Sequence, residues 1–198
     1  MYPNSIKNLV ESFKLLPGIG EKTAERLAFF LLELDDEKVE FFSNSLKEIK
    51  NKIKKCPICN NYTENEFCNI CSDNTRNNKI LCVIEEQKSL YLFEKIGTYH
   101  GQYHILNGLI SPLEGINPED IGMEQLIKRI EQNEFAEIII AVKPSVEGET
   151  TSLYIKKVLS NLNLKVTKIA SGIPMGTDIE YIDALTLERA LADRKELE

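Results

Sequence analysis

The sequence predicts an α/β fold with small satellites: an N-terminal helical region, a four-cysteine module, a mainly parallel sheet with flanking helices, and a short C-terminal helical segment. Three observations carry this prediction. Apolar residues recur at helical spacing through residues 1–55, four cysteines gather within residues 56–71, and strand-like and helix-like runs alternate from residue 79 onwards. We expect domains at residues 1–55, 56–71, 79–174 and 175–198.

The composition is that of a globular protein. The chain has 198 residues, of which 42% are hydrophobic and 28% charged, and no apolar stretch approaches membrane-spanning length. The net charge of −7 argues against a protein that coats nucleic acid with its whole surface. Residues 1–55 carry 10 Lys and Arg against 9 Asp and Glu, whereas residues 56–198 carry 14 against 22. Any nucleic-acid contact should therefore lie near the N-terminus.

Three amphipathic helices are expected before the cysteines. The first should end at the turn Leu16–Gly20, because Pro17 disfavours helical geometry in the residue before it and the glycines allow backbone angles that a side chain forbids. The second helix follows this turn, and the third leads into the cysteine module. Their apolar stripes are Ile6, Leu9, Val10, Phe13 and Leu16, then Ala24, Leu27, Ala28, Leu31 and Leu32, then Val39, Phe42, Leu46, Ile49 and Ile53.

The glycine turn is a candidate phosphate contact. Backbone amides freed by Gly18 and Gly20 at a helix N-terminus can donate to a phosphate oxygen. Lys22 and Arg26, four residues apart, share one helix face and add positive charge. Such contacts read no bases, so binding would be independent of DNA sequence. The alternative is an ordinary turn between two core helices, with Lys22 and Arg26 as solvated charges.

Four cysteines, Cys56, Cys59, Cys68 and Cys71, have the spacing of a zinc site. Each two-residue gap lets both sulfurs of a pair point into one site, and the eight residues between the pairs suffice to turn the chain back. The alternative is two disulfides in a secreted protein, but no charged-then-apolar leader precedes the chain, which favours zinc and the cytoplasm. Because cysteine fills all four positions, we expect one structural zinc per chain.

The remaining chain predicts a parallel sheet. Strand-like runs at Ile80–Glu85, Glu137–Val142 and Lys165–Ala170 alternate with helix-like segments at Gln87–Ile96, Met123–Gln132 and Thr150–Leu162. The strand-like runs are continuously apolar, as buried parallel strands are. Chemistry in such sheets collects at the carboxyl ends of the strands, here Glu85–Glu86 and Lys143–Glu149. His100 and His104 lie in an extended or turn-like segment and are expected to be ordinary hydrogen-bonded residues.

The segment Lys143–Glu149 resembles the Toprim motif of type IA topoisomerases, which reads Asp-Pro-Asp-Arg-Glu-Gly-Glu, and Glu85 matches the glutamate that closes the first Toprim strand. Lys143 and Ser145 stand where that motif has aspartates. Mg²⁺ binds through carboxylate oxygens, so a cation at a ligand position repels the metal. The resemblance therefore implies a Toprim fold without Toprim catalysis.

Three carboxylates remain at this edge, on Glu85, Glu147 and Glu149. They could form a weak metal site, a surface for a partner protein or a set of solvated charges. We favour the partner surface, because an acidic patch at the open end of a sheet suits a basic partner.

The turn segment Leu16–Leu27 closely resembles the helix-hairpin-helix motif of DNA repair proteins. In the order hairpin, four-cysteine module, Toprim-like segment and C-terminal run Gly172–Tyr181, the whole chain resembles the bacterial recombination mediator family RecR. Further stretches that resemble this family are Leu81–Glu85, Tyr99–His104, Ser111–Ile116 and Pro144–Tyr154. One departure is Lys143, where family members usually carry asparagine, which adds a positive charge beside Glu147.

This resemblance implies a non-catalytic DNA-repair factor. RecR proteins act with RecO, and in some settings RecF, to load RecA onto single-stranded DNA at gaps. They form homo-oligomers, dimers or tetrameric rings that can encircle single- or double-stranded DNA, closed by the N-terminal helices and C-terminal elements. The resemblance places the chain at the bacterial nucleoid and away from membranes. The alternatives are a small magnesium-dependent nuclease or primase-like Toprim enzyme that uses the three glutamates, and a zinc-dependent interaction module with no DNA role.

Overall fold

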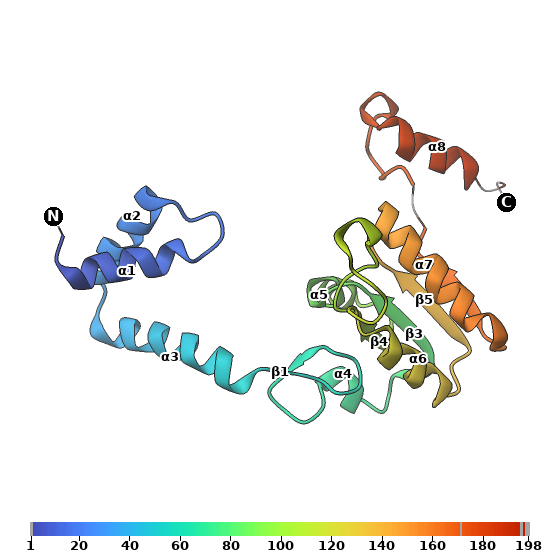
Figure 1. The fold of residues 1–198 in the computed structure, drawn as a ribbon, viewed down its shortest axis with the longest axis horizontal. Helices are drawn as coiled ribbons and strands as arrows, with labels where there is room; N and C mark the ends of the chain where they lie inside the picture. The colour runs from blue at the N-terminus through green and yellow to red at the C-terminus, as the bar shows by residue number, and fades with distance from the viewer. Residues whose placement is uncertain (1, 171, 195, 197–198) are drawn as a thin grey trace. The chain divides into compact units, whose positions relative to one another are not determined.

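The computed structural model describes residues 2–170, 172–194 and 196. It divides into two compact units, Met1–Ile53 and Lys54–Glu198, and Figure 1 traces the helices and strands of each. Among the described residues, no helix is long and apolar enough to cross a membrane.

The first unit contains the three predicted helices, α1 (Asn4–Lys14), α2 (Glu21–Leu32) and α3 (Asp36–Lys52). Helices α1 and α2 pack on each other through a small core of Val10, Ala24 and Ala28. The small alanine side chains let the two helix backbones come close. Helix α1 ends two residues before the predicted position, with Leu15 as its C-cap.

Helix α3 forms where it was predicted, but none of its residues is buried in the unit. Its apolar side remains open to solvent, with Phe41 75%, Leu46 57% and Ile49 59% exposed. An amphipathic helix gains most of its stability from burying its apolar face, so this stripe lacks its partner surface within the unit.

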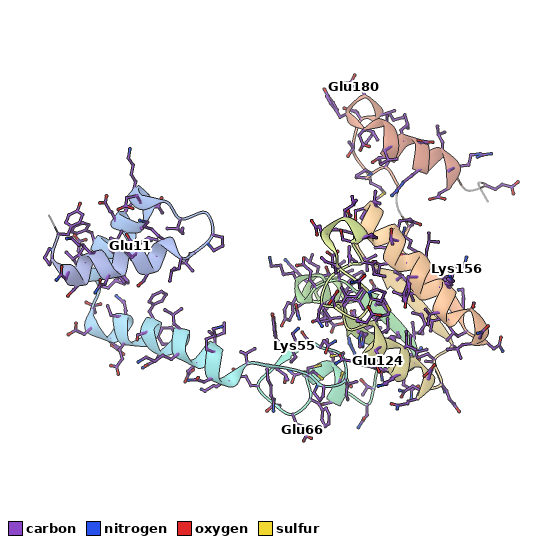
Figure 2. The ribbon with its side chains drawn as sticks, in the orientation of Figure 1. Glu11, Lys55, Glu66, Glu124, Lys156 and Glu180 are labelled. Atoms are coloured by element: carbon purple, nitrogen blue, oxygen red, sulfur yellow. The ribbon has the colours of Figure 1, made fainter. Side chains whose placement is uncertain are left out.

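The second unit begins with the cysteine module, which contains the strands β1 (Lys54–Lys55) and β2 (Tyr62–Thr63) and the short helix α4 (Asn69–Ser72). Strands β1 and β2 pair antiparallel. Figure 2 labels Lys55 on β1 and Glu66 in the loop that leads to α4.

A four-stranded sheet follows, in the order β4-β3-β5-β6, and all of its neighbouring strands are parallel. The strands are β3 (Asn77–Ile84), β4 (Gly101–Ile105), β5 (Glu137–Ala141) and β6 (Lys165–Lys168). The helices are α5 (Gln87–Ile96), α6 (Met123–Glu131) and α7 (Val146–Val158), with single 3₁₀ turns at Pro112–Glu114 and Leu159–Asn161.

Both faces of the sheet are buried, as the apolar strands predicted. Successive residues of β3 point to opposite faces. Leu81 and Val83 join a core with α6 and α7, whereas Cys82 and Ile84 join a second core with α5. Figure 1 shows α7 and α5 separated by the strands.

Two elements around the four-stranded sheet differ most from the sequence prediction. Strand β4 was not predicted, because it has five residues and includes the polar side chains of Gln102 and His104. Helix α7 begins at Val146 and not at Thr150, because the Ser145 side chain caps it by accepting a hydrogen bond from the Gly148 amide at 3.2 Å. Glu147 and Glu149 therefore lie in the first turn of a helix.

The predicted C-terminal helical segment is confirmed. It contains a 3₁₀ turn at Ile179–Tyr181 and the helix α8 (Ala184–Ala192). Asp183 caps α8, and its carboxylate accepts a hydrogen bond from the Thr186 amide at 2.9 Å.

Candidate functional site

The four cysteines converge on one site. Their sulfur atoms all lie within 4.8 Å of one another. Cys56, Cys59 and Cys68 are buried, Cys71 is half-buried, and none of the four is in a disulfide. Among the described residues this is the one group of three or more His, Cys, Asp or Glu side chains whose ligand atoms gather closely enough to hold a metal ion.

The geometry fits one structural zinc. A tetrahedron of Zn–S bonds of about 2.3 Å places its sulfurs roughly 3.8 Å apart, and the Cys59 and Cys68 sulfurs are 3.4 Å apart. The hydrogen bond between the Cys59 and Cys68 sulfurs raises the pKa of the Cys59 thiol to about 12, and all four thiols can lose their protons together only when a cation lies between them. Zn²⁺ would supply that cation, and its four cysteine ligands leave no position for substrate.

A tight turn shapes the first cysteine pair. The Asn60 amide donates to the Cys56 carbonyl at 2.9 Å, and the Cys56 amide donates to the Asn61 carbonyl at 2.7 Å. This closes the loop and requires Asn60 to adopt a left-handed φ of 63°, which asparagine tolerates better than most residues. The turn directs both cysteine side chains of the pair to the same side.

The cysteine module is attached to the edge strand β4. The Ile105 amide donates to the Cys59 carbonyl at 2.9 Å, and the Asn60 side-chain amide donates to the Ile105 carbonyl at 3.0 Å. An edge strand otherwise exposes unpaired backbone groups that can pair with other chains. The module therefore covers the open edge of the sheet, a contact that its sequence did not indicate.

The strand-end site consists of Lys143 and the carboxylates of Glu85, Glu147 and Glu149, and two of these carboxylates form ion pairs. Lys143 follows β5 and Glu85 follows β3, and their side chains lie 3.4 Å apart. The two strands are neighbours, with Ile84 opposite Ala141. The sequence predicts that the Lys143 charge lies beside Glu147. In the structure Lys143 also has a second carboxylate neighbour, because it forms an ion pair with Glu85 at the end of the adjacent strand.

The other two carboxylates have partners of their own. The Ser145 hydroxyl donates to the Glu147 carboxylate at 2.7 Å, and this bond, with a smaller effect of Lys143, lowers the pKa of Glu147. Glu149 forms an ion pair with Lys168 on β6, which lowers its pKa. The three predicted carboxylates thus lie at one end of the sheet, but each is engaged by a different side chain.

The first turn of α7 has no room for a side chain at position 148. A β-carbon added there would lie 1.9 Å from the Lys143 backbone oxygen. The start of α7 therefore packs directly on the backbone that carries Lys143.

The hairpin between α1 and α2 presents the predicted phosphate-contact groups. Gly18 has a φ of 81°, which favours glycine, and Gly20 is the N-cap of α2. Lys22 and Arg26 are exposed on α2. The nearby carboxylate of Glu21 is engaged by Lys14 at 2.7 Å, which leaves the hairpin less acidic than its sequence suggests.

Sequence reasoning missed a buried polar cluster beneath the cysteine module. His104 is 2% exposed and lies on β4, whereas His100 is exposed, so the two histidines do not form a pair. A guanidinium nitrogen of Arg129, on α6, lies 3.5 Å from Nδ1 of His104. Within the described part of the chain, Nε2 of His104 has no hydrogen-bond partner. Arg129 lies within an amphipathic helix and carried no sequence signal of burial.

Comparison with protein families finds a matching family model for four successive segments of the chain. Residues 6–50 match a family model described as RecR, helix-hairpin-helix, and residues 53–73 match the RecR zinc finger domain with four cysteine ligands. Residues 79–170 match the Toprim domain, and residues 172–195 match RecR, C-terminal. The chain is a RecR-like protein.

These matches confirm the fold class, the helix-hairpin-helix, the Toprim fold and one structural zinc. They also support a role for this RecR-like protein as a recombination mediator in DNA repair. The zinc finger matched at residues 53–73 includes the four cysteines and the β1–β2 hairpin that carries the first pair.

Proposed function

We propose that this RecR-like protein is a non-catalytic mediator that binds DNA and works with RecO, and in some settings RecF, to load RecA onto single-stranded DNA at gaps. The Lys143–Glu85 ion pair carries the non-catalytic part of this proposal. An ammonium group at the end of β5 neutralises the carboxylate that would otherwise bind Mg²⁺ and repels the metal itself. We place this activity in the bacterial cytoplasm, at the nucleoid.

DNA binding is proposed for the hairpin. Gly18 and Gly20 expose backbone amides at the start of α2, and Lys22 and Arg26 have no carboxylate within ion-pair distance among the residues that the structure describes. Both groups suit phosphate contacts that are independent of base sequence.

Partner binding is proposed for Glu85, Glu147 and Glu149. Carboxylates at the open end of a sheet repel phosphate and attract a basic protein surface. Lys143 reduces the negative charge of this surface and sets it apart from the usual family pattern with asparagine.

The chain is also proposed to form a dimer or a tetrameric ring. Exposed apolar residues on α3, among them Phe41, support an interface between N-terminal units. In the segment after residue 175, Leu185 and Leu191 on α8 are 59% and 61% exposed and support a second interface. Light scattering with and without DNA would give the mass of the assembly.

Incubation with end-labelled DNA and Mg²⁺ tests the proposed function. A salt-sensitive mobility shift with no change in DNA length is the expected result. Cleavage or synthesis that requires Glu85 would establish the alternative, a nuclease or primase-like Toprim enzyme. A protein that retains zinc but binds neither single- nor double-stranded DNA would establish the third reading, an interaction module.

A further inference from the structure

Arg129 is a buried cation with neutral contacts. Its side chain is 8% exposed, and among the residues that the structure describes no carboxylate lies within ion-pair distance. One guanidinium nitrogen donates to the Tyr103 carbonyl at 2.6 Å and the other to the Gln102 side chain at 2.7 Å. The guanidinium carbon lies 5.9 Å from the centre of the Phe135 ring. A buried charge with no opposite charge nearby is costly, so its counterpart must be sought elsewhere.

The cysteine site supplies that counterpart. Arg129 and Cys71 line the same cavity of about 500 Å³, together with Pro57 and Ile58 of the cysteine module. Burial lowers the pKa of Arg129, and the charges of the four cysteine sulfurs oppose this effect. One Zn²⁺ with four thiolates carries a net charge of about −2.

The contacts of Arg129 also reach the sheet edge that the module covers. Gln102 and Tyr103 belong to β4, and two residues further along Ile105 pairs with the module through Cys59 and Asn60. The same short strand is therefore held by the module's backbone and by Arg129.

We propose that Arg129 is the counter-charge of the zinc–thiolate centre and connects that centre to strand β4. Zinc holds the cysteine module together, and Arg129 offsets part of the negative charge that this creates inside the protein. Metal ligands depend in this way on outer-shell partners, whose loss typically lowers metal affinity about 10–100-fold.

The experiment compares the full-length, zinc-loaded protein with Arg129→Gln and with Lys128→Gln. The control removes the same charge from the preceding residue of α6, Lys128, which lines the same cavity but is exposed and paired with Glu124, a residue labelled in Figure 2. Zinc transfer to the chromophoric chelator 4-(2-pyridylazo)resorcinol gives the relative affinity. We expect Arg129→Gln to lose about 10–100-fold in zinc affinity and Lys128→Gln to match wild type.

Thermal melting tests whether the contribution of Arg129 to stability depends on the bound metal. We expect Arg129→Gln to lower the Tm more in the zinc-loaded protein than after chelation, because the anionic centre exists only with the metal bound. An equal loss of Tm in both states, or zinc retention equal to that of Lys128→Gln, overturns the proposal.

Two further variants keep the test decisive. Arg129→Lys retains the charge but not the two-nitrogen fork that contacts β4, so it should bind zinc more tightly than Arg129→Gln; a zinc affinity no higher than that of Arg129→Gln contradicts the proposal. Cys71→His keeps a zinc ligand but makes the centre one unit less negative. Arg129→Gln should therefore cost less zinc affinity in that background, and an undiminished cost would also contradict the proposal.

Discussion

The ammonium group of Lys143 lies 3.4 Å from the carboxylate of Glu85, across the carboxyl ends of two neighbouring parallel strands. Lys143 is 57% exposed and Glu85 is 23% exposed, so the pair lies at the surface of the strand-end site. Surface ion pairs contribute little to stability. The effect of this pair is on the charge that the site presents to a metal ion or to a partner.

Lys143→Asn is expected to speed association with a RecO-like partner, because it frees the Glu85 carboxylate for a basic surface. Rim charges act mainly on the association rate and its salt dependence, so the measurement is the association rate constant at low and high salt. A slower association would mean that the partner uses the lysine itself. Magnesium-dependent cleavage of DNA by this variant would support the enzyme reading.

Glu147→Ala is expected to slow association with the same partner and to leave DNA binding near the wild-type level. The carboxylate attracts a basic protein but repels phosphate. Surface plasmon resonance measures the association rate with the partner and, in a separate experiment, the affinity for DNA. Glu131→Ala, which removes an exposed carboxylate at the end of α6, is the control, and an equal effect of the two changes would remove Glu147 from the interface.

Lys22→Ala combined with Arg26→Ala is expected to weaken DNA binding equally for all sequences and to leave the fold intact. If each contact releases about one counterion, the slope of log affinity against log salt should fall in magnitude by roughly one to two units. Lys7→Ala combined with Lys47→Ala removes the same charge from α1 and α3 as a control. An unchanged slope in the hairpin variant would place the DNA contact elsewhere.

Removal of zinc, by chelation or by Cys59→Ser, is expected to unfold the cysteine module and to expose strand β4. Structural zinc contributes on the order of 10 kcal/mol to such small sites. Hydrogen exchange should accelerate at Ile105, whose amide donates to Cys59, while the central strands β3 and β5 stay protected. Elemental analysis should find one zinc per chain, and protein purified without chelator that contains none would contradict the assignment.

Gly148→Ala is expected to destabilise the Toprim unit even though alanine is the better helix former by about 1 kcal/mol. The added methyl group would lie 1.9 Å from the Lys143 backbone oxygen, and overpacking of this kind typically costs about 1–3 kcal/mol. At Gly172 an added methyl group meets nothing within 4 Å, so Gly172→Ala is the control. Denaturant unfolding measures both variants, and equal stability would show that the turn can relax.

Acid is expected to destabilise the protein through His104. Burial beside Arg129 lowers the pKa of His104 to about 3, whereas an unfolded histidine titrates near 6.5. Below roughly pH 6.5 the unfolded state therefore binds a proton at this histidine and the folded state does not. The free energy of unfolding falls by up to about 1.4 kcal/mol per pH unit in this range. His104→Gln should reduce the slope between pH 6.5 and 5 with zinc bound, whereas His100→Gln should not. Equal slopes in all three proteins would contradict this account.

Much of the fold could be predicted because its signals are local. The helix Gln87–Ile96 forms over the predicted residues, since its apolar spacing alone specifies it. Strand β4 could not be predicted, because its polar Gln102 and His104 find a common partner in Arg129 on α6, which is remote in sequence. The early start of α7 depends on Ser145 as N-cap, a short-range signal that the Toprim-like motif obscured.

The sequence by itself determined the chemistry that residue type and spacing specify: four cysteines for one zinc, a glycine hairpin, a parallel sheet and a lysine in place of an aspartate. Only the tertiary structure decided which charges meet, because ion pairs form between side chains that strands and helices bring together and not between sequence neighbours. It paired Lys143 with Glu85 and Glu149 with Lys168. It also placed Arg129 beneath the cysteine module, since the burial of a helix face depends on what packs against it.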